Sequence, residues 1–185
     1  YDHMEYFYVD WDMLSVNVGR KNGEYVGNIG TGRTDSYLVD KTADIDSQVS
    51  VFNARLDAMV ADVSTAVGAN ATTREIPKAA NDVVCNAVTY DFCDDANGNA
   101  TEASKYIRTA YGALVNGRAV CEGYARLYKA VLNELGVQGE LVSGYYIDGE
   151  AFEPHMWNYV QMEDGAWYLI DLTWNDAGES AYTTW

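Results

Sequence analysis

The strongest helical pattern in the chain begins in the stretch Ala119-Val120-Cys121-Glu122-Gly123-Tyr124-Ala125. From there apolar side chains recur at helical spacing, and polar or charged side chains occupy the opposite face. The apolar stripe comprises Cys121, Tyr124, Ala125, Tyr128, Val131, Leu132 and Leu135, and the polar face comprises Glu122, Arg126, Lys129, Asn133 and Glu134. Gly136 is the expected C-terminal stop. The pattern therefore predicts a helix that starts at Cys121 and packs one face into a core.

The position of Cys121 at the start of this helix has a chemical consequence. Backbone N–H groups in a first helical turn have no intrahelical acceptor, and the helix dipole places partial positive charge there. Both effects stabilise a thiolate, and the same N–H groups can receive the oxyanion of an attacked acyl carbon. A cysteine on an apolar stripe is by itself more often a core residue, so the chemical interpretation depends on partners elsewhere in the chain.

Two later segments supply such partners: His155-Met156-Trp157-Asn158-Tyr159 and Trp167-Tyr168-Leu169-Ile170-Asp171-Leu172-Thr173-Trp174. Strands are predicted over residues 139–147, 155–162 and 166–172. Asp171 stands in an otherwise apolar strand, where a carboxylate needs a buried partner. The candidate partner is His155, one of only two histidines in the chain. Thiol, imidazole and carboxylate are the nucleophile, the base and the group that orients the base in cysteine-dependent catalysis.

Hairpin geometry decides whether Asp171 can reach His155. A two-residue Asp164-Gly165 turn would set Asp171 opposite Asn158, on the face of the sheet away from His155. A three-residue loop, Glu163-Asp164-Gly165 with Gly165 in the left-handed conformation, pairs Asp171 with Trp157 instead. Trp157 shares a face with His155 because side chains alternate along a strand. We predict the three-residue loop, which places Asp171 diagonally next to His155.

Residues 1–70 are expected to form an N-terminal extension packed on a core of residues 71–185. Short strands are predicted over residues 6–9 and 25–29, and a helix over residues 44–67. The apolar positions of that helix are Val51, Leu56, Met59, Val60 and Val63. A capping box of Thr72 and Glu75, with Pro77 in the first turn, opens a second helix that ends near Val88. A polar loop over 91–101 and a helix over 102–114, broken by Asn116-Gly117, lead to Cys121.

The composition excludes some classes of function. The 185 residues carry a net charge of −16, and the 12 Lys and Arg residues do not cluster, so a nucleic-acid-binding surface is excluded. No apolar run reaches membrane-spanning length, so no membrane insertion is expected. An acidic chain with 15 Tyr and 5 Trp favours an extracellular or cell-surface protein, although plain solubility explains the charge equally well. The start at Tyr1 without a signal peptide indicates a segment of a longer, processed chain.

The three cysteines leave two arrangements open. Cys85 and Cys93 could bridge, which would leave Cys121 as the free thiol. The favoured arrangement has Cys85 as a small apolar residue on a helix and Cys93 in the loop that follows it. The sequence contains no CxxC pair and no His-rich cluster, which argues against a zinc site and against a thiol redox protein.

Taken together, the three segments resemble the transglutaminase-like superfamily, part of the wider papain-like group. The bacterial members carry motifs of the form G-x-A-V-C-E-G-Y-A, H-x-W-N-x-V and W-Y-x-I-D-x-T-W, which stand here at Gly117–Ala125, His155–Val160 and Trp167–Trp174. The resemblance covers residues 73–176 and includes Val88-Thr89-Tyr90-Asp91 at the end of the helix before the core. The segment at residues 6–9 resembles a weaker N-terminal segment of bacterial secreted members. Leu172 departs from the pattern, because many relatives have proline there.

The resemblance implies an α+β, papain-like fold, with N-terminal helices and the Cys121 helix packed on an antiparallel sheet. It implies Cys121 as nucleophile, His155 as base and acid, and Asp171 as orienting group. The expected activity is acyl chemistry on protein or peptide amides through a thioester, ending in hydrolysis or transamidation. It also implies a side-chain oxyanion donor upstream of Cys121, for which Tyr111 and Asn116 are candidates, while Trp157 and Trp174 are candidates for the walls of the acyl site. The rival interpretation is a catalytically silent binding or scaffolding module of the same fold.

No cofactor is expected, and calcium is the alternative considered because eukaryotic transglutaminases use it. Four residues alternate like the ligands of a cation loop: Asp95, Asn97, Asn99 and Thr101. The sixth position of that loop is Ala100 rather than glycine, and the twelfth is Tyr106 rather than glutamate. A solvated polar loop is therefore the favoured interpretation.

Overall fold

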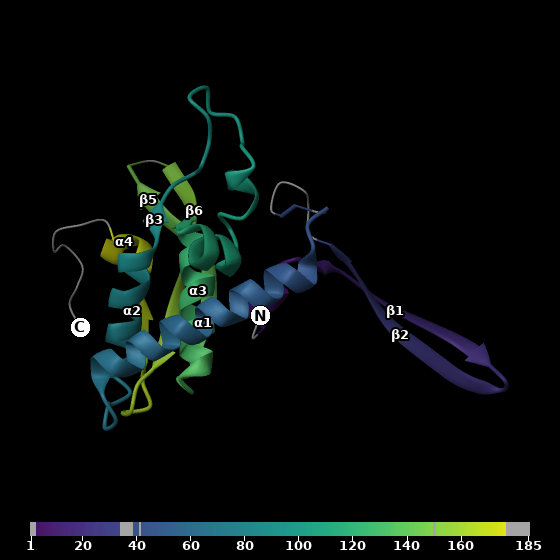
Figure 1. The fold of residues 1–185 in the computed structure, drawn as a ribbon, viewed down its shortest axis with the longest axis horizontal. Coiled ribbons are helices and arrows are strands. Elements are labelled where there is room, and N and C mark those ends of the chain that lie inside the picture. Colours follow the sequence, from purple (N-terminus) through teal and green to yellow (C-terminus); the bar gives the residue numbers. More distant parts are fainter. Residues whose placement is uncertain (1–2, 34–38, 41, 150, 177–185) are drawn as a thin grey trace.

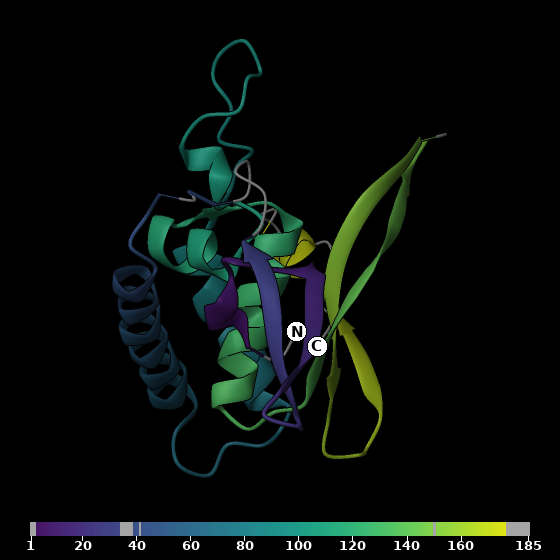
Figure 2. The same cartoon turned by 90° about the vertical axis from the view of Figure 1, so that its right-hand side faces the viewer.

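Helix α3 (Cys121–Glu134) lies at the centre of the fold, with the other helices on one side and a three-stranded sheet on the other (Figures 1 and 2). The computed structural model describes residues 3–33, 39–40, 42–149 and 151–176. The helix begins at Cys121 as predicted, and Gly136 follows it with a positive φ of 71°. Its apolar stripe is buried at Tyr124, Ala125, Tyr128, Val131 and Leu132.

The exposed face of α3 is narrower than the polar face predicted from the sequence. Lys129 was placed on that face, but it is only 5% exposed, and Leu127, outside the predicted stripe, is fully buried. The reason is the central position of the helix, which contacts α1 and α2 as well as β5 and β6. A helix covered on two sides buries residues outside its single predicted stripe.

Strands β5 (Gly139–Asp148), β6 (Ala151–Gln161) and β7 (Trp167–Ile170) form an antiparallel sheet in the order β5-β6-β7. The β5–β6 hairpin extends past the body of the molecule (Figure 2). Between β6 and β7 the Met162 N–H donates to the Ala166 carbonyl at 3.0 Å, and Gly165 has a φ of 77°. The loop therefore has three residues, and the register of Asn158 with Ile170 runs on to put Asp171 level with Trp157. The predicted loop and register are confirmed.

The last strand ends earlier than predicted. β7 stops at Ile170, and Asp171 follows it as the cap of a short helix, α4 (Leu172–Asp176). The Asp171 carboxylate accepts a hydrogen bond from the Trp174 N–H at 3.4 Å, and its carbonyl accepts one from the Asn175 N–H at 3.0 Å. An aspartate side chain satisfies the free N–H groups of a first helical turn, so it favours a cap over a strand interior.

Helices α1 (Ile45–Val67) and α2 (Glu75–Ala87) match their predicted extents closely. The capping box forms in both directions: the Thr72 N–H donates to the Glu75 carboxylate at 2.9 Å, and the Glu75 N–H donates to the Thr72 hydroxyl at 3.2 Å. α1 packs against α2 and α3 and buries Phe52, Leu56, Met59 and Val63. Val51, one of its predicted core positions, is 40% exposed.

The helix predicted over residues 102–114 is wrong. The segment forms a 3-10 helix, η2 (Ala103–Lys105), then a turn, then a π-helical turn, η3 (Gly112–Asn116). Thr109 causes the break, because its hydroxyl donates to the Tyr106 carbonyl at 2.7 Å and accepts from the Gly112 N–H at 3.0 Å. A threonine side chain that bonds to nearby backbone in this way competes with a continuous helix.

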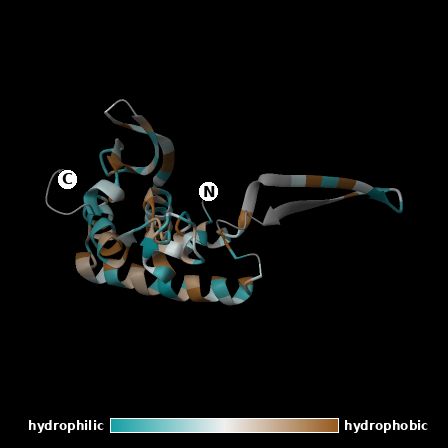
Figure 3. Ribbon diagram, turned by 90° about the horizontal axis from the view of Figure 1, so that it is seen from above, coloured by the Kyte–Doolittle hydropathy of each residue, from teal (hydrophilic) through white to brown (hydrophobic). Residues whose placement is uncertain are grey.

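The N-terminal strands are longer than predicted and form one hairpin. A 3-10 helix, η1 (Met4–Tyr6), precedes the first strand, and β1 (Val9–Lys21) starts only at Val9, the last residue of the predicted 6–9 strand. β2 (Glu24–Arg33) includes the predicted 25–29 strand. Asn22-Gly23 joins them with φ angles of 53° and 88°, as in a tight two-residue turn. The hairpin projects away from the helices (Figures 1 and 3).

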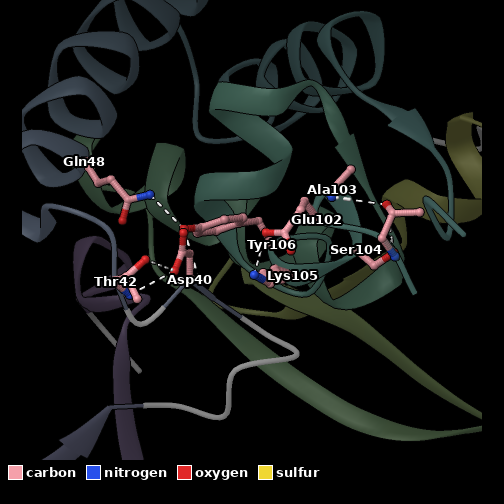
Figure 4. A network of polar contacts seen from close by, with 9 residues as sticks. Asp40, Thr42, Gln48, Glu102, Ala103, Ser104, Lys105 and Tyr106 are labelled. Carbon is pink, nitrogen blue, oxygen red and sulfur yellow. Dashed lines mark hydrogen bonds and ion pairs between the residues drawn. The ribbon is translucent and has the colours of Figure 1, made fainter. Parts of the chain in front are cut away.

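Other N-terminal residues are bound to the core by a polar network (Figure 4). The Tyr106 hydroxyl accepts hydrogen bonds from the Asp40 N–H at 3.1 Å and from the Gln48 side-chain amide at 2.8 Å. The Asp40 carboxylate in turn accepts from the Thr42 N–H at 2.8 Å. Met4 and Val39 join the same hydrophobic cluster as α3. The division of the chain at residue 70 stays a prediction.

Candidate active site

His155 on β6 and Asp171 at the cap of α4 form a close, buried pair. The His155 Nε2 and an Asp171 carboxylate oxygen lie 2.6 Å apart, with 6% and 12% of the two side chains exposed. The Cys121 side chain lies near enough to the imidazole to raise the pKa of His155. Because Nε2 faces Asp171, the other ring nitrogen, Nδ1, is left for the sulfur. The three groups singled out from the sequence are therefore brought together from three different elements.

The charge state of His155 follows from these contacts. Burial lowers the pKa of His155, but the hydrogen bond to Asp171, the negative charge of that carboxylate and the nearby Cys121 sulfur outweigh it and raise the pKa to about 9. The ring is therefore protonated at neutral pH. A protonated imidazole in this position can give its proton to a group that approaches the sulfur.

Aromatic side chains surround the imidazole. The Trp157 ring stacks on it with centroids 5.9 Å apart, Tyr146 meets it edge-on at 5.5 Å, and Trp174 lies 6.1 Å away. Trp157 lies across Gly144, where an added Cβ would come within 2.5 Å of the indole. Two of these residues, Trp157 and Trp174, were predicted to wall the site, whereas Tyr146 was missed because nothing in its local pattern marks it.

Tyr90 is the second residue that sequence reasoning missed. Strands β3 (Thr89–Tyr90) and β4 (Arg118–Ala119) pair in parallel, so Tyr90 lies level with Ala119, two residues before the nucleophile candidate. Burial and the nearby Cys121 sulfur raise the pKa of Tyr90, and the Cys121 backbone N–H lowers it by less. The phenol therefore keeps its proton and can donate it in a hydrogen bond beside the start of α3. Its only sequence signal was its place in the segment Val88-Thr89-Tyr90-Asp91.

The two residues proposed as oxyanion donors lie elsewhere. Tyr111 packs between aromatic rings, 4.6 Å from Phe7 and 5.1 Å from Tyr106, on the side of the core that faces α1. Asn116 is exposed at the end of the π-helical turn. In the described part of the chain neither side chain hydrogen-bonds to Cys121, His155 or Asp171.

The free state of the other cysteines matches the favoured arrangement. Cys85 on α2 and Cys93 in the following loop are both free, as is Cys121. In the loop considered for calcium, the Asp95 carboxylate accepts hydrogen bonds from the N–H groups of Asn97 and Asn99 at 2.8 and 2.9 Å. Across the described residues no cluster of three or more His, Cys, Asp or Glu side chains is suited to hold a metal.

A sequence profile of the transglutaminase-like superfamily matches residues 61–172, more than half of the chain, and this span includes Cys121, His155 and Asp171. The chain belongs to the transglutaminase-like superfamily. The match begins inside α1, so that helix is at least partly within the region shared with other transglutaminase-like proteins.

Two curated relatives are similar to parts of the chain. Kyphoscoliosis peptidase of Mus musculus is 28% identical over 140 residues, which cover 65% of this chain and 20% of the relative. Kyphoscoliosis peptidase of Homo sapiens is 31% identical over 101 residues, which cover 49% of this chain and 14% of the relative. The chain thus matches about a fifth or less of the length of these relatives.

A solved structure supports the transglutaminase-like fold. The crystal structure of a TGase aligns with a TM-score of 0.58 and 18% identity, covering 94% of this chain and 49% of that one. At that identity the likeness concerns the fold alone. The predicted α+β, transglutaminase-like fold is confirmed, with α3 packed on an antiparallel sheet. The described residues include no helix with the length and hydrophobicity needed to cross a membrane.

Proposed function

We propose that the protein catalyses cysteine-dependent acyl chemistry on amide bonds of proteins or peptides. Cys121 is the nucleophile, His155 the general base and acid, and Asp171 the group that orients the imidazole. The observation that carries the proposal is the buried 2.6 Å contact of His155 with Asp171, next to a cysteine at the N-terminus of a 14-residue helix. A carboxylate, an imidazole and a thiol in that order are the parts of an activated nucleophile.

The first half-reaction transfers the acyl group to sulfur. The Cys121 thiolate attacks the carbonyl carbon, a C–S bond forms, and the C=O electron pair moves onto oxygen. The Cys121 N–H and the Tyr90 hydroxyl are the donors proposed for this oxyanion, because both lie at the start of α3. Protonated His155 then gives its proton to the leaving amine as the C–N bond breaks, which leaves a thioester.

The second half-reaction resolves the thioester. Neutral His155 takes a proton from water or from an amine, the new bond forms at the acyl carbon, and the thiolate leaves. Water gives hydrolysis and an amine gives transamidation. The relatives are named as peptidases, which favours hydrolysis, although they match only part of their length.

The proposed substrates are polypeptides outside the cell or at the cell surface. The acidic, aromatic-rich composition supports this location. Trp174, which is 40% exposed and contacts Tyr146 at 5.5 Å, offers an apolar surface next to the imidazole for the residue that carries the acyl group.

Alkylation across pH tests the proposal. The protein is treated with iodoacetamide between pH 5 and 10, and the adduct is located by mass spectrometry, with Cys85 and Cys93 as internal references. We expect selective labelling of Cys121 at pH 6 and loss of that selectivity in His155→Ala. Labelling of Cys121 no faster than a free thiol would overturn the catalytic role and leave a binding module of the same fold. Glutaminyl peptides with and without an added amine then separate transfer from hydrolysis.

A further inference from the structure

Tyr124 lies one helical turn after Cys121 on α3 and is completely buried. Its hydroxyl oxygen lies 3.0 Å from the Val88 carbonyl oxygen and closer still to the Asp176 carboxylate, so its single proton is shared between these two acceptors. Buried hydroxyl groups need such partners, because burial without a hydrogen bond is unfavourable. Both acceptors of the Tyr124 hydroxyl lie in segments close to the candidate active site.

Each partner belongs to a segment that carries a residue of the site. Val88 directly precedes β3, and the Tyr124 ring stacks on the ring of Tyr90 with centroids 6.3 Å apart and planes 24° apart. Asp176 is the last residue of α4, whose first turn is capped by Asp171. One side chain on the nucleophile helix therefore contacts both the segment of the oxyanion donor and the segment of the carboxylate.

The α4 helix depends on contacts of this kind. It has five residues, too few for a helix that is stable by itself in water. Leu172 is buried in the core, and the polar contacts of α4 include the Tyr124–Asp176 bond, the Asn175 side-chain amide donating to Asn81 at 2.7 Å, and the Cys85 thiol near the Leu172 carbonyl at 3.7 Å. Among these three polar contacts, the bond to Tyr124 is the one that leads to the helix that carries Cys121.

We propose that Tyr124 is a positioning residue that sets the distances between Cys121, Tyr90 and Asp171. Its ring stacks on Tyr90, and its hydroxyl proton is shared between the carbonyl that precedes β3 and the carboxylate that ends α4, so the carboxylate of Asp171 and the phenol of Tyr90 are held beside the start of α3. This inference rests on the proposed function of the site. Residues that hold reacting groups matter because a displacement of about 1 Å can cost about a hundredfold in rate.

Tyr128 provides a matched control. It lies on the same helix, is also completely buried, and its hydroxyl donates to the Pro77 carbonyl at 2.9 Å. Pro77 is in the first turn of α2 and carries no group of the site. Tyr124→Phe and Tyr128→Phe therefore both remove a buried hydroxyl and keep the ring, and only the first releases segments of the site.

Two reactions of Cys121 depend on different parts of the site. Iodoacetamide alkylation at pH 6 depends on the Cys121–His155 pair and needs no oxyanion donor. Acylation by p-nitrophenyl acetate, followed by release of p-nitrophenolate, depends on the pair and also on the donors at Tyr90 and the Cys121 N–H. A third variant, Asp176→Ala, releases α4 and leaves the bond from Tyr124 to Val88.

We expect Tyr124→Phe to slow acylation about tenfold to a hundredfold, and to slow alkylation by a smaller factor. Asp176→Ala should slow both reactions by the same factor, because it disturbs only the carboxylate side. Tyr128→Phe should lower the melting temperature and change neither rate by more than about twofold. Equal acylation rates in Tyr124→Phe and Tyr128→Phe, or an Asp176→Ala variant with wild-type rates, would overturn the inference. A wild-type protein that shows neither reaction at Cys121 would overturn the proposed function itself.

Discussion

Replacement of Asp171 by asparagine is expected to lower the pKa of His155 from about 9 by at least about one pH unit. The substituted amide would keep the size of the side chain but lose the negative charge that lies 2.6 Å from Nε2. Burial lowers the pKa of His155, and the largest effects that raise it come from Asp171 and Cys121, with the hydrogen bond to Asp171 first among them. Removal of that contact therefore takes away the largest effect that opposes burial.

The size of the effect on stability follows from the same numbers. The pKa of about 9 stands about 2.5 above the ordinary value of 6.5, and each unit corresponds to about 1.4 kcal/mol, so protonated His155 contributes about 3 kcal/mol. The pKa is raised on folding, so this stabilisation is fully present below pH 6.5 and is lost as the pH rises through 9. The wild-type free energy of unfolding should therefore fall between pH 6 and pH 10 by more than that of Asp171→Asn.

Proton NMR measures the pKa directly, because the chain has only two histidines and His155→Gln identifies the resonance. Urea unfolding at pH 6 and pH 10 gives the free energies. Asp164→Asn is the matched control: it removes one negative charge from the same hairpin, where Asp164 accepts from the Tyr168 hydroxyl at 2.6 Å. A wild-type His155 that titrates near 6.5, or an Asp171→Asn variant that still titrates near 9, would refute the argument.

Three further variants test other contacts of the site. Tyr90→Phe removes a proposed oxyanion donor, so the rate of acylation by p-nitrophenyl acetate should fall about a hundredfold. The rate of iodoacetamide alkylation of Cys121 should not change. An equal loss of rate in both reactions would contradict the role of Tyr90 as a donor. Gly144→Ala would force the Trp157 indole away from an added Cβ 2.5 Å distant, which should cost about 1–3 kcal/mol in urea unfolding, whereas Gly19→Ala, with open space around its Cβ, should cost far less. Asn158→Ala removes a fully buried amide that donates to the Ala125 carbonyl at 3.1 Å and joins β6 to α3. The free energy of unfolding should fall by at least about 1 kcal/mol, and alkylation of Cys121 at pH 6 should slow. An unchanged alkylation rate would show that this bond does not hold His155 in place relative to Cys121.

The parts of the fold that follow from local patterns were predicted well. Helical spacing and capping residues located α1, α2 and α3 because both act within a few residues of each other. The loop before Trp167 was predicted correctly because Gly165 favours a positive φ, and loop length fixes the register of a hairpin.

Predictions failed where a side chain had a choice of partners. Thr109 bonds to nearby backbone and divides the helix predicted over 102–114, and Asp171 caps α4 instead of continuing a strand. Lys129 was expected on a solvated face, but α3 is covered on two sides. In each case the residue type is compatible with both the predicted and the observed local structure. Contacts with other parts of the chain select the observed one.

Local sequence patterns identify the chemical groups of this protein and the elements that carry them: a cysteine at the start of a helix, a histidine on a strand and an aspartate one hairpin later. Periodicity, caps and turn residues suffice for that, because they are properties of neighbouring residues. Three placements become visible only in the folded chain: Tyr90 beside the start of α3, Tyr146 against the imidazole, and Tyr124 in contact with both β3 and α4. Those placements join segments far apart in the chain, and they follow from how α3 is enclosed rather than from any local pattern.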